Sequence, residues 1–162
     1  VLFDDKYEMV TKRQDVNNVP TLTEKQYFVR GCTALLDAIG KSIKFMEQEQ
    51  AKKVIFIITT DGYENASREF NKDQIKEMIS GHKEWEFMYI GADIDSYSEG
   101  QSIGINSSNI ANYKKDKKGI SKLFKAMFLA SEEFCDEDCI ASSWKEDLED
   151  YMEENTEQTN ND

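Results

Sequence analysis

The sequence predicts an open, doubly wound α/β fold of the Rossmann-like type, with a mostly parallel sheet and helices on both faces. Apolar patterns typical of strands and helices alternate along the chain, and such alternation implies a parallel sheet covered by helices. The run from Val54 to Ile58 is short, β-branched and apolar on both faces. This pattern is typical of a central parallel strand that is covered on both sides.

The expected elements follow from local patterns. Residues 1–10 are expected to form a hairpin that turns at residues 4–6, and residues 11–31 an irregular connection. Asn71 and Gln74 resemble a capping box, which predicts that a helix begins there. The other expected elements are a helix over 33–50, a strand over 85–90, a short helix over 95–103, a short edge strand over 109–113, and a long helix from Ile120 to Phe134.

The negative charge is concentrated at the carboxyl end. The chain has 162 residues and a net charge of −12. Residues 132–162 hold thirteen acidic residues and one basic residue, Lys145, whereas residues 1–131 hold nineteen of each. We therefore expect a domain over residues 1–134 and an acidic helix and tail over 135–162, disordered from residue 153. The helix, which would carry Trp144, is either a loosely attached end or a partner-docking element.

Composition excludes several classes of protein. The balanced charge of residues 1–131 disfavours nucleic-acid binding, and the lysines at 114–118 are interpreted as a solvated loop. We find no apolar run that could span a membrane and no signal segment. Three cysteines argue against a disulfide framework, so a cytoplasmic protein is expected. Cys135 and Cys139 are interpreted as reduced thiols, with a redox pair or half a metal site as alternatives.

Asp61 is the first candidate for chemistry. In open parallel α/β sheets, ligands bind at the carboxyl ends of the strands, and Asp61 follows an apolar run there. Gly62 lets the backbone turn away, and Thr33 stands at the start of a helix in another turn. A hydroxyl and a carboxylate suggest a hard cation such as Mg²⁺. Asp93, after the next strand, is a possible further contributor at the same crevice.

Two stretches carry a resemblance to a known family. The sequences "GCTALLDAI" at 31–39 and "VIFIITTDGYENAS" at 54–67 resemble the von Willebrand factor A (vWA) domains. The metal-ion-dependent adhesion site (MIDAS) of that family combines a D-x-S-x-S motif after the first strand, a threonine in a G-x-T turn and an aspartate in a T-D-G turn. Residues 31–33 resemble the second element and residues 60–62 the third. The flanks are similar to small stand-alone bacterial and phage members, and the resemblance covers residues 1–130.

The resemblance implies a site and a fold. Thr33 would bind Mg²⁺ or Mn²⁺ through its hydroxyl, Asp61 would hold the ion through a water, and a partner's acidic side chain would complete the coordination. Gly31 and Gly62 would shape the two turns. The chain has no D-x-S-x-S motif, and Val1 would begin in the family's second strand. We therefore expect an amino-terminally incomplete domain that lacks the first strand and helix, with a weakened metal site.

Three functions remain open at this point. The leading hypothesis is a protein-binding module that recognises an acidic side chain through a MIDAS-type metal. The alternatives are a metal-free interaction scaffold with a degenerate site and a phosphoaspartate-type hydrolase or transferase. An enzyme is not expected, because Asp61 has no paired aspartate in its own turn and His82 is the only histidine. Taken singly, Thr33 could be a helix N-cap and Asp61 a turn former.

Overall fold

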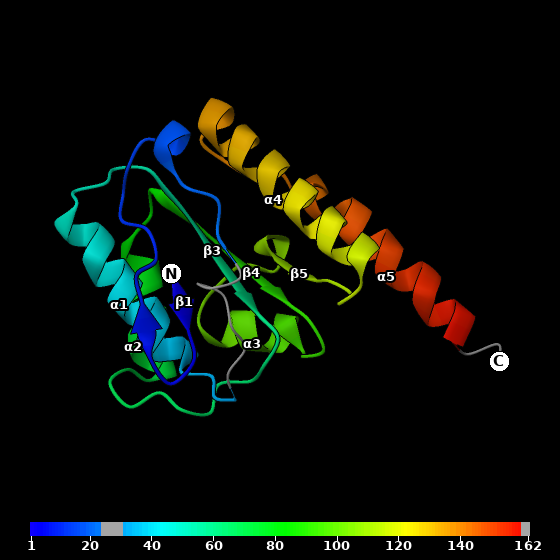
Figure 1. Cartoon of the computed structure of the whole chain (residues 1–162), viewed down its shortest axis with the longest axis horizontal. Helices are drawn as coiled ribbons and strands as arrows, with labels where there is room; N and C mark the ends of the chain where they lie inside the picture. The colour runs from blue at the N-terminus through cyan, green and yellow to red at the C-terminus, as the bar shows by residue number, and fades with distance from the viewer. Residues whose placement is uncertain (24–30, 160–162) are drawn as a thin grey trace.

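The computed structural model describes the backbone of residues 1–23 and 31–159, and the side chains of these residues up to Glu154. Its centre is a parallel sheet in the order β3 (Val54–Thr60), β4 (Trp85–Gly91), β5 (Ile110–Asn112). Helices lie on both faces of this sheet (Figure 1). The predicted α/β class and the parallel sheet with flanking helices are therefore confirmed.

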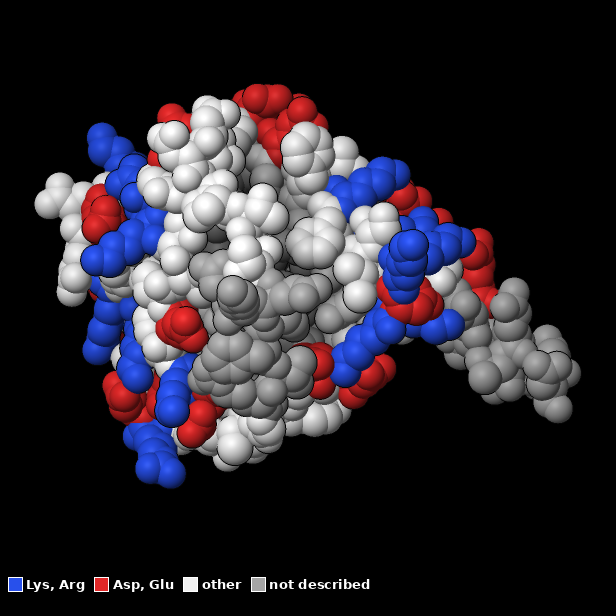
Figure 2. Space-filling view, in the orientation of Figure 1, with Lys and Arg blue, Asp and Glu red and all other residues white. Residues whose placement is uncertain are grey.

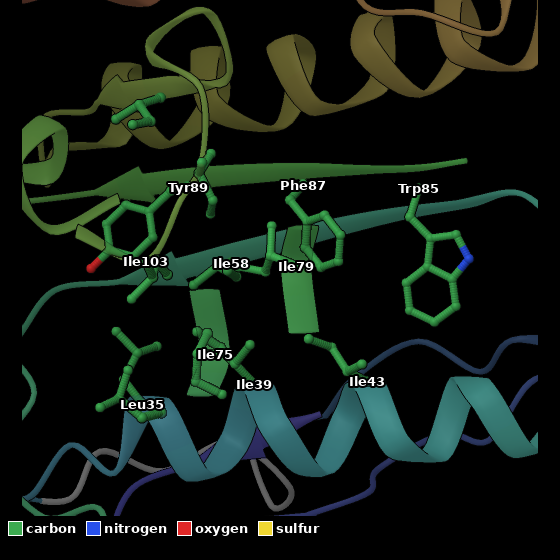
Figure 3. Packing of buried hydrophobic residues seen from close by; sticks show 13 residues of the cluster. Leu35, Ile39, Ile43, Ile58, Ile75, Ile79, Trp85, Phe87, Tyr89 and Ile103 are labelled. Atoms are coloured by element: carbon green, nitrogen blue, oxygen red, sulfur yellow. The ribbon is translucent and has the colours of Figure 1, made fainter. Parts of the chain in front are cut away.

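The two helical layers bury the two faces of β4. α1 (Leu35–Gln48), α2 (Lys72–Gly81) and α3 (Ser96–Ser102) cover one face, and α4 (Lys117–Glu137) and α5 (Glu146–Thr159) cover the other. Successive residues of a strand point to opposite faces. Phe87 and Tyr89 accordingly pack toward α1 (Figure 3), whereas Met88 and Ile90 pack toward α4.

β3 corrects one prediction. Its sequence predicts a central strand, yet among the described residues it pairs only with β4 and forms an edge of the sheet. Most of its apolar side chains are only partly buried. The strands β1 (Leu2–Phe3) and β2 (Tyr7–Glu8) pair with each other as the predicted hairpin and form a separate sheet. As far as the described part of the chain shows, β3 is therefore less buried than its apolar sequence predicts.

Several local predictions are confirmed. Asn71 and Gln74 form the full capping box at the start of α2. The short helix and the short strand expected near residues 95–103 and 109–113 are α3 and β5. The expected irregular connection contains the 3₁₀ turn η1 (Val16–Asn18), and the rest of that prediction lies partly outside the described residues. A second 3₁₀ turn, η2 (Ser107–Asn109), leads into β5.

The carboxyl-terminal segment packs on the domain. After α4, the 3₁₀ turn η3 (Ser142–Lys145) leads into α5, and Trp144 and Leu148 are 4% and 1% exposed. The Lys145 ammonium donates to the carbonyl oxygens of Ser107 and Ile110 at 3.0 and 2.9 Å. A loosely attached end is therefore wrong for this segment. The backbone is helical as far as Thr159, and the rest of the predicted disordered end lies outside the described residues.

The surface carries both signs of charge. On the face shown in Figure 2, basic and acidic side chains are interspersed along both flanks. Within the described residues, no helix combines the length and apolar character needed to cross a bilayer. Cys32, Cys135 and Cys139 are all free and exposed.

Candidate functional site

The candidate site lies at the carboxyl ends of the strands. Asp61 follows β3, Asp93 follows β4, and Asn112 is the last residue of β5. Because parallel strands end at one edge of the sheet, these three residues lie along that edge. We call this edge the rim, and it comprises Thr33, Asp61, Asp93, Asn112 and Lys115.

Lys115 joins the two carboxylates of the rim. Its Nζ lies 3.0 Å from Asp93 Oδ2 and 3.2 Å from Asp61 Oδ2. Hydrogen bonds to Asp93 and then to Asp61 raise the pKa of Lys115 above its ordinary value. Lys115 is itself exposed, so these ion pairs are made in a solvated segment, as the sequence predicted, and they add a specific contact that the sequence did not indicate. Sequence spacing gave no signal for it, because the three residues follow three different strands.

Thr33 meets the turn that carries Asp61. A Cβ added to Gly62 would lie 2.9 Å from Thr33 Oγ1, so a side chain at residue 62 would displace the Thr33 hydroxyl. The Thr33 N–H donates to Asn65 Oδ1 at 2.9 Å, and the Asn65 N–H donates to the Thr33 carbonyl at 3.0 Å. The two sequence motifs thus lie together in space. A Cβ at Gly31 would meet no atom within 4 Å, so steric contact gives no reason for glycine there.

Neither local alternative for the two motif residues holds. The N-cap of α1 is Ala34, with no side-chain capping bond, so Thr33 is not the cap. The turn after β3 is closed by the Thr60 hydroxyl, which accepts from the Gly62 N–H and donates to the Gly62 carbonyl at 3.3 and 3.0 Å. The Asp61 carboxylate instead points to Lys115 and is largely exposed.

Glu64 fixes the Asp61 loop to the start of α1. Its carboxylate accepts the N–H groups of Leu36, Ala66 and Ser67 at 2.9, 2.9 and 2.7 Å, and the Ser67 hydroxyl at 2.7 Å. Burial by itself would raise the pKa of Glu64, but these hydrogen bonds outweigh it and hold the pKa below its ordinary value. Glu64 therefore supplies the capping that Thr33 does not.

Asp37 makes the reciprocal connection from α1. Its carboxylate accepts the backbone N–H groups of Arg68, Glu69 and Phe70, each at 2.9 Å. Burial opposes ionisation, yet these three donors and the charge of Lys41 keep the pKa of Asp37 below its ordinary value. Asp37 and Glu64 both lie within the quoted motifs, but their sequence alone does not indicate that they join the two loops.

The rim contains the kinds of oxygen atom that a hard cation binds. A hydroxyl, two carboxylates and an amide oxygen are oxygen ligands of the kind that Mg²⁺ takes, and Mg²⁺ needs only one or two carboxylates because it keeps several waters. Asn112 Oδ1 is buried and has no hydrogen-bond partner within the described chain. No group of three or more His, Cys, Asp or Glu side chains suited to a metal occurs among the described residues. A divalent ion at the rim must compete with the Lys115 ammonium.

Comparisons of the chain with protein-family models, with curated proteins and with solved structures gave no match. The rim is therefore interpreted from its own chemistry. His82 takes no part in it: the ring lies at the end of α2, stacks on Trp85 with a centroid distance of 3.9 Å, and contacts Glu47 at 3.0 Å.

Proposed function

We propose that the chain is a protein-binding module that recognises an acidic side chain of a partner through Mg²⁺ or Mn²⁺ at the rim. The observation that carries the proposal is the meeting of Thr33 with the turn of Asp61, beside a second carboxylate from Asp93. Thr33, Asp61 and Asp93 would hold the ion. Recognition of a partner carboxylate through the ion is proposed from the vWA resemblance together with the oxygen atoms of these three residues.

The charge of the rim suits such recognition. A divalent ion held by two carboxylates remains electrophilic enough to attract one more carboxylate from outside. Without the ion, the Lys115 ammonium balances part of the negative charge of Asp61 and Asp93. Asp61 and Asp93 are exposed, with side-chain accessibilities of 65% and 70%, so an incoming group reaches them without opening the core.

The test measures binding of Mn²⁺ to the full chain by electron paramagnetic resonance, followed by binding of a short aspartate-containing peptide. Asp61→Ala is expected to abolish both, and Asp5→Ala, an exposed aspartate of the hairpin, is the matched control. Binding of the peptide that continues unchanged in excess chelator contradicts the proposal, as does unchanged Mn²⁺ affinity in Asp61→Ala.

A metal-free scaffold is the second candidate, and the position of Lys115 favours it. The ammonium already offers one positive charge at the rim, where a partner carboxylate could meet it without a metal. This candidate expects peptide binding that persists in chelator, weakens with added salt and is lost in Lys115→Met.

The phosphoaspartate alternative gains support from the same geometry. The second carboxylate and the lysine that such chemistry needs are absent from the turn of Asp61 but are supplied in space by Asp93 and Lys115. Incubation with acetyl phosphate and Mg²⁺, followed by mass spectrometry, tests it. A covalent phosphoryl adduct on Asp61 would overturn the binding proposal, whereas no adduct is expected if the module only binds.

A further inference from the structure

The outward face of α4 carries exposed apolar side chains. Ile120, Phe124 and Phe128 are 42%, 64% and 64% exposed. Because they recur at four-residue spacing, they form one row along the helix, which we call the apolar stripe. Exposed apolar residues that are scattered singly are ordinary, whereas a contiguous row of them is typical of an interaction surface.

The other sides of α4 have neighbours within the described chain. Leu123 is 4% exposed and belongs to the core cluster under the sheet. Lys125 pairs with Asp147 at 2.7 Å on α5, which lies alongside α4 (Figure 1). Successive residues turn by about 100° around a helix, so Phe124 lies between these two contacts, about 100° from each. The apolar stripe therefore takes part in neither contact.

Charge divides α4 into two halves. All lysines of the helix precede residue 126, and all of its acidic residues follow residue 131: Lys117, Lys118, Lys122 and Lys125, and then Glu132, Glu133, Asp136 and Glu137. The helix dipole favours the reverse distribution, so the stability of α4 itself does not explain this one. Two such helices attract each other when they run in opposite directions, because each basic half then faces an acidic half.

The two ends of the apolar stripe carry opposite charges. Lys117 lies three residues before Ile120, and Glu132 lies four residues after Phe128, so each is within about one helical turn of the stripe. Both side chains are exposed, and neither makes an ion pair within the described chain. Both charges are therefore available to a molecule that covers the stripe.

Nearby groups of the opposite sign are already engaged. At the amino end of α4, Asp116 accepts the Gly119 N–H at 2.7 Å and the Tyr151 hydroxyl at 3.0 Å. At the carboxyl end, Lys53 pairs with Asp138. The stripe is therefore bordered by a free lysine at one end and by a free glutamate at the other.

The stripe is symmetric about Phe124, as a two-fold contact requires. Ile120 and Phe128 lie four residues to either side of Phe124, and Lys117 and Glu132 lie seven and eight residues away. A second α4 can be laid antiparallel, with Phe124 of both copies on the two-fold axis. Ile120 of each copy then meets Phe128 of the other, and Lys117 meets Glu132 in the same way. Because such a contact is reciprocal, both of its ends gain the same ion pair.

We propose that the apolar stripe is the interface of a symmetric dimer, in which α4 packs antiparallel on α4 of a second copy of this chain. Phe124 of each copy lies at the two-fold axis, and Lys117 of each pairs with Glu132 of the other. An unrelated partner would require no such symmetry, whereas a second copy supplies both the apolar row and the reversed charges. One helix from each copy makes a small contact, so the dimer is expected to be transient.

Sedimentation equilibrium of the full chain over a series of concentrations measures this association. The unsubstituted chain is expected to change from monomer to dimer as its concentration rises. Phe124→Ser is expected to weaken dimerisation by about tenfold or more without unfolding the chain, because this exposed side chain lies at the centre of the contact. Leu129→Ser is the matched control, since Leu129 is 43% exposed and lies about 140° from Phe124 around the helix.

Charge reversal tests which residues face each other. Lys117→Glu and Glu132→Lys each place like charges opposite one another at both ends of the contact, so each variant should self-associate several-fold more weakly. In an equimolar mixture of the two variants, opposite charges again meet at both ends of the mixed dimer. The mixture should therefore dimerise about as tightly as the unsubstituted chain.

The distance between two spin labels tests the direction of pairing. In a chain with Cys32→Ser and Cys139→Ser, the exposed Cys135 carries a nitroxide, and double electron–electron resonance measures the distance between copies. Cys135 lies eleven residues beyond Phe124, so antiparallel pairing should separate the two labelled positions by roughly 33 Å along the helix axis. Parallel pairing would bring them to about the 8–10 Å that separates packed helices.

Four results overturn the proposal. They are a chain that stays monomeric at every concentration, dimerisation that Phe124→Ser leaves unchanged, a mixture of the charge-reversed variants that associates no better than either variant alone, and labels that lie close together. Dimerisation should persist in excess chelator, because the rim takes no part in the contact. Loss of the dimer in chelator would assign the association to the rim instead, so this proposal and the metal-dependent one can fail separately.

Discussion

The Lys115 ammonium lies 3.2 Å from the Asp61 carboxylate, although one residue follows β5 and the other follows β3. The same ammonium reaches Asp93, which follows the strand between them and has a left-handed backbone with φ of 58°. Aspartate tolerates this conformation better than most residues. The Lys115 ammonium thus neutralises part of the negative charge of the rim, and any metal ion or basic ligand that binds there must compete with it.

Replacing Lys115 should strengthen divalent-ion binding. In Lys115→Met, Asp61 and Asp93 lose their shared counter-charge, so Mn²⁺ affinity is expected to rise about tenfold, equivalent to about 1.4 kcal/mol. Isothermal titration calorimetry measures the change, and Lys117→Met, an exposed lysine at the start of α4, is the control. Equal Mn²⁺ affinity in the two variants and the unsubstituted chain would show that Lys115 does not compete with the ion.

Asp37→Asn should destabilise the chain at neutral pH. The carboxylate accepts three backbone N–H groups, and hydrogen bonds to a charged group contribute about 1.5–3 kcal/mol, so the free energy of unfolding is expected to fall by about 3 kcal/mol. Because the pKa of Asp37 is lowered in the folded state, its contribution is present above the ordinary carboxyl pKa and is lost as the pH falls through the folded pKa.

Urea unfolding at several pH values measures this effect. The difference between the unsubstituted chain and Asp37→Asn should shrink toward acid pH, and Asp5→Asn, in the exposed hairpin turn, should change stability little. A difference that stays constant as the pH falls would mean that ionisation of Asp37 is not what stabilises the loop.

Two glycine substitutions should act in opposite directions. A Cβ at Gly40 in α1 would lie 2.7 Å from the Phe70 ring, so Gly40→Ala is expected to cost about 1–3 kcal/mol through overpacking. At Gly81, the last residue of α2, a Cβ would meet nothing within 4 Å, so Gly81→Ala should be neutral or slightly stabilising. Thermal unfolding of the pair compares them directly, and an equal loss of stability would contradict the packing argument.

Lys145 should hold the carboxyl-terminal helix on the domain. Its ammonium donates to Ser107, Ile110 and Tyr97, so Lys145→Met leaves the buried Ile110 carbonyl and the partly buried Ser107 carbonyl without this donor and is expected to cost about 2–3 kcal/mol. Limited proteolysis should then cleave η3 and α5 faster. Lys125→Met, which removes a more exposed ion pair to Asp147, should leave the cleavage rate nearly unchanged.

Local signals carried most of the fold prediction. The capping box at Asn71 and the apolar spacing of α1 are short-range patterns, and a chain segment can satisfy them without its tertiary neighbours. Among the described residues, β3 has a strand neighbour on one side only. The sequence did not indicate this, because an apolar sequence shows that a strand can be buried and does not show which strands lie beside it. The burial of the segment around Trp144 was underestimated for a related reason. The acidic residues that dominate its composition lie on the exposed side of the helix, whereas Trp144 and Leu148 are buried against the domain.

For the candidate site, the sequence by itself predicted Thr33, Asp61 and Gly62, because they stand in two short motifs at the expected end of a strand and start of a helix. Only the tertiary structure decided that Lys115 bridges Asp61 and Asp93, and that Asp37 and Glu64 join the two loops. The physical reason is that ion pairs and hydrogen bonds between distant segments depend on where the parallel strands end. The packing of the whole sheet decides where each strand ends, and a short stretch of sequence gives no information about that packing.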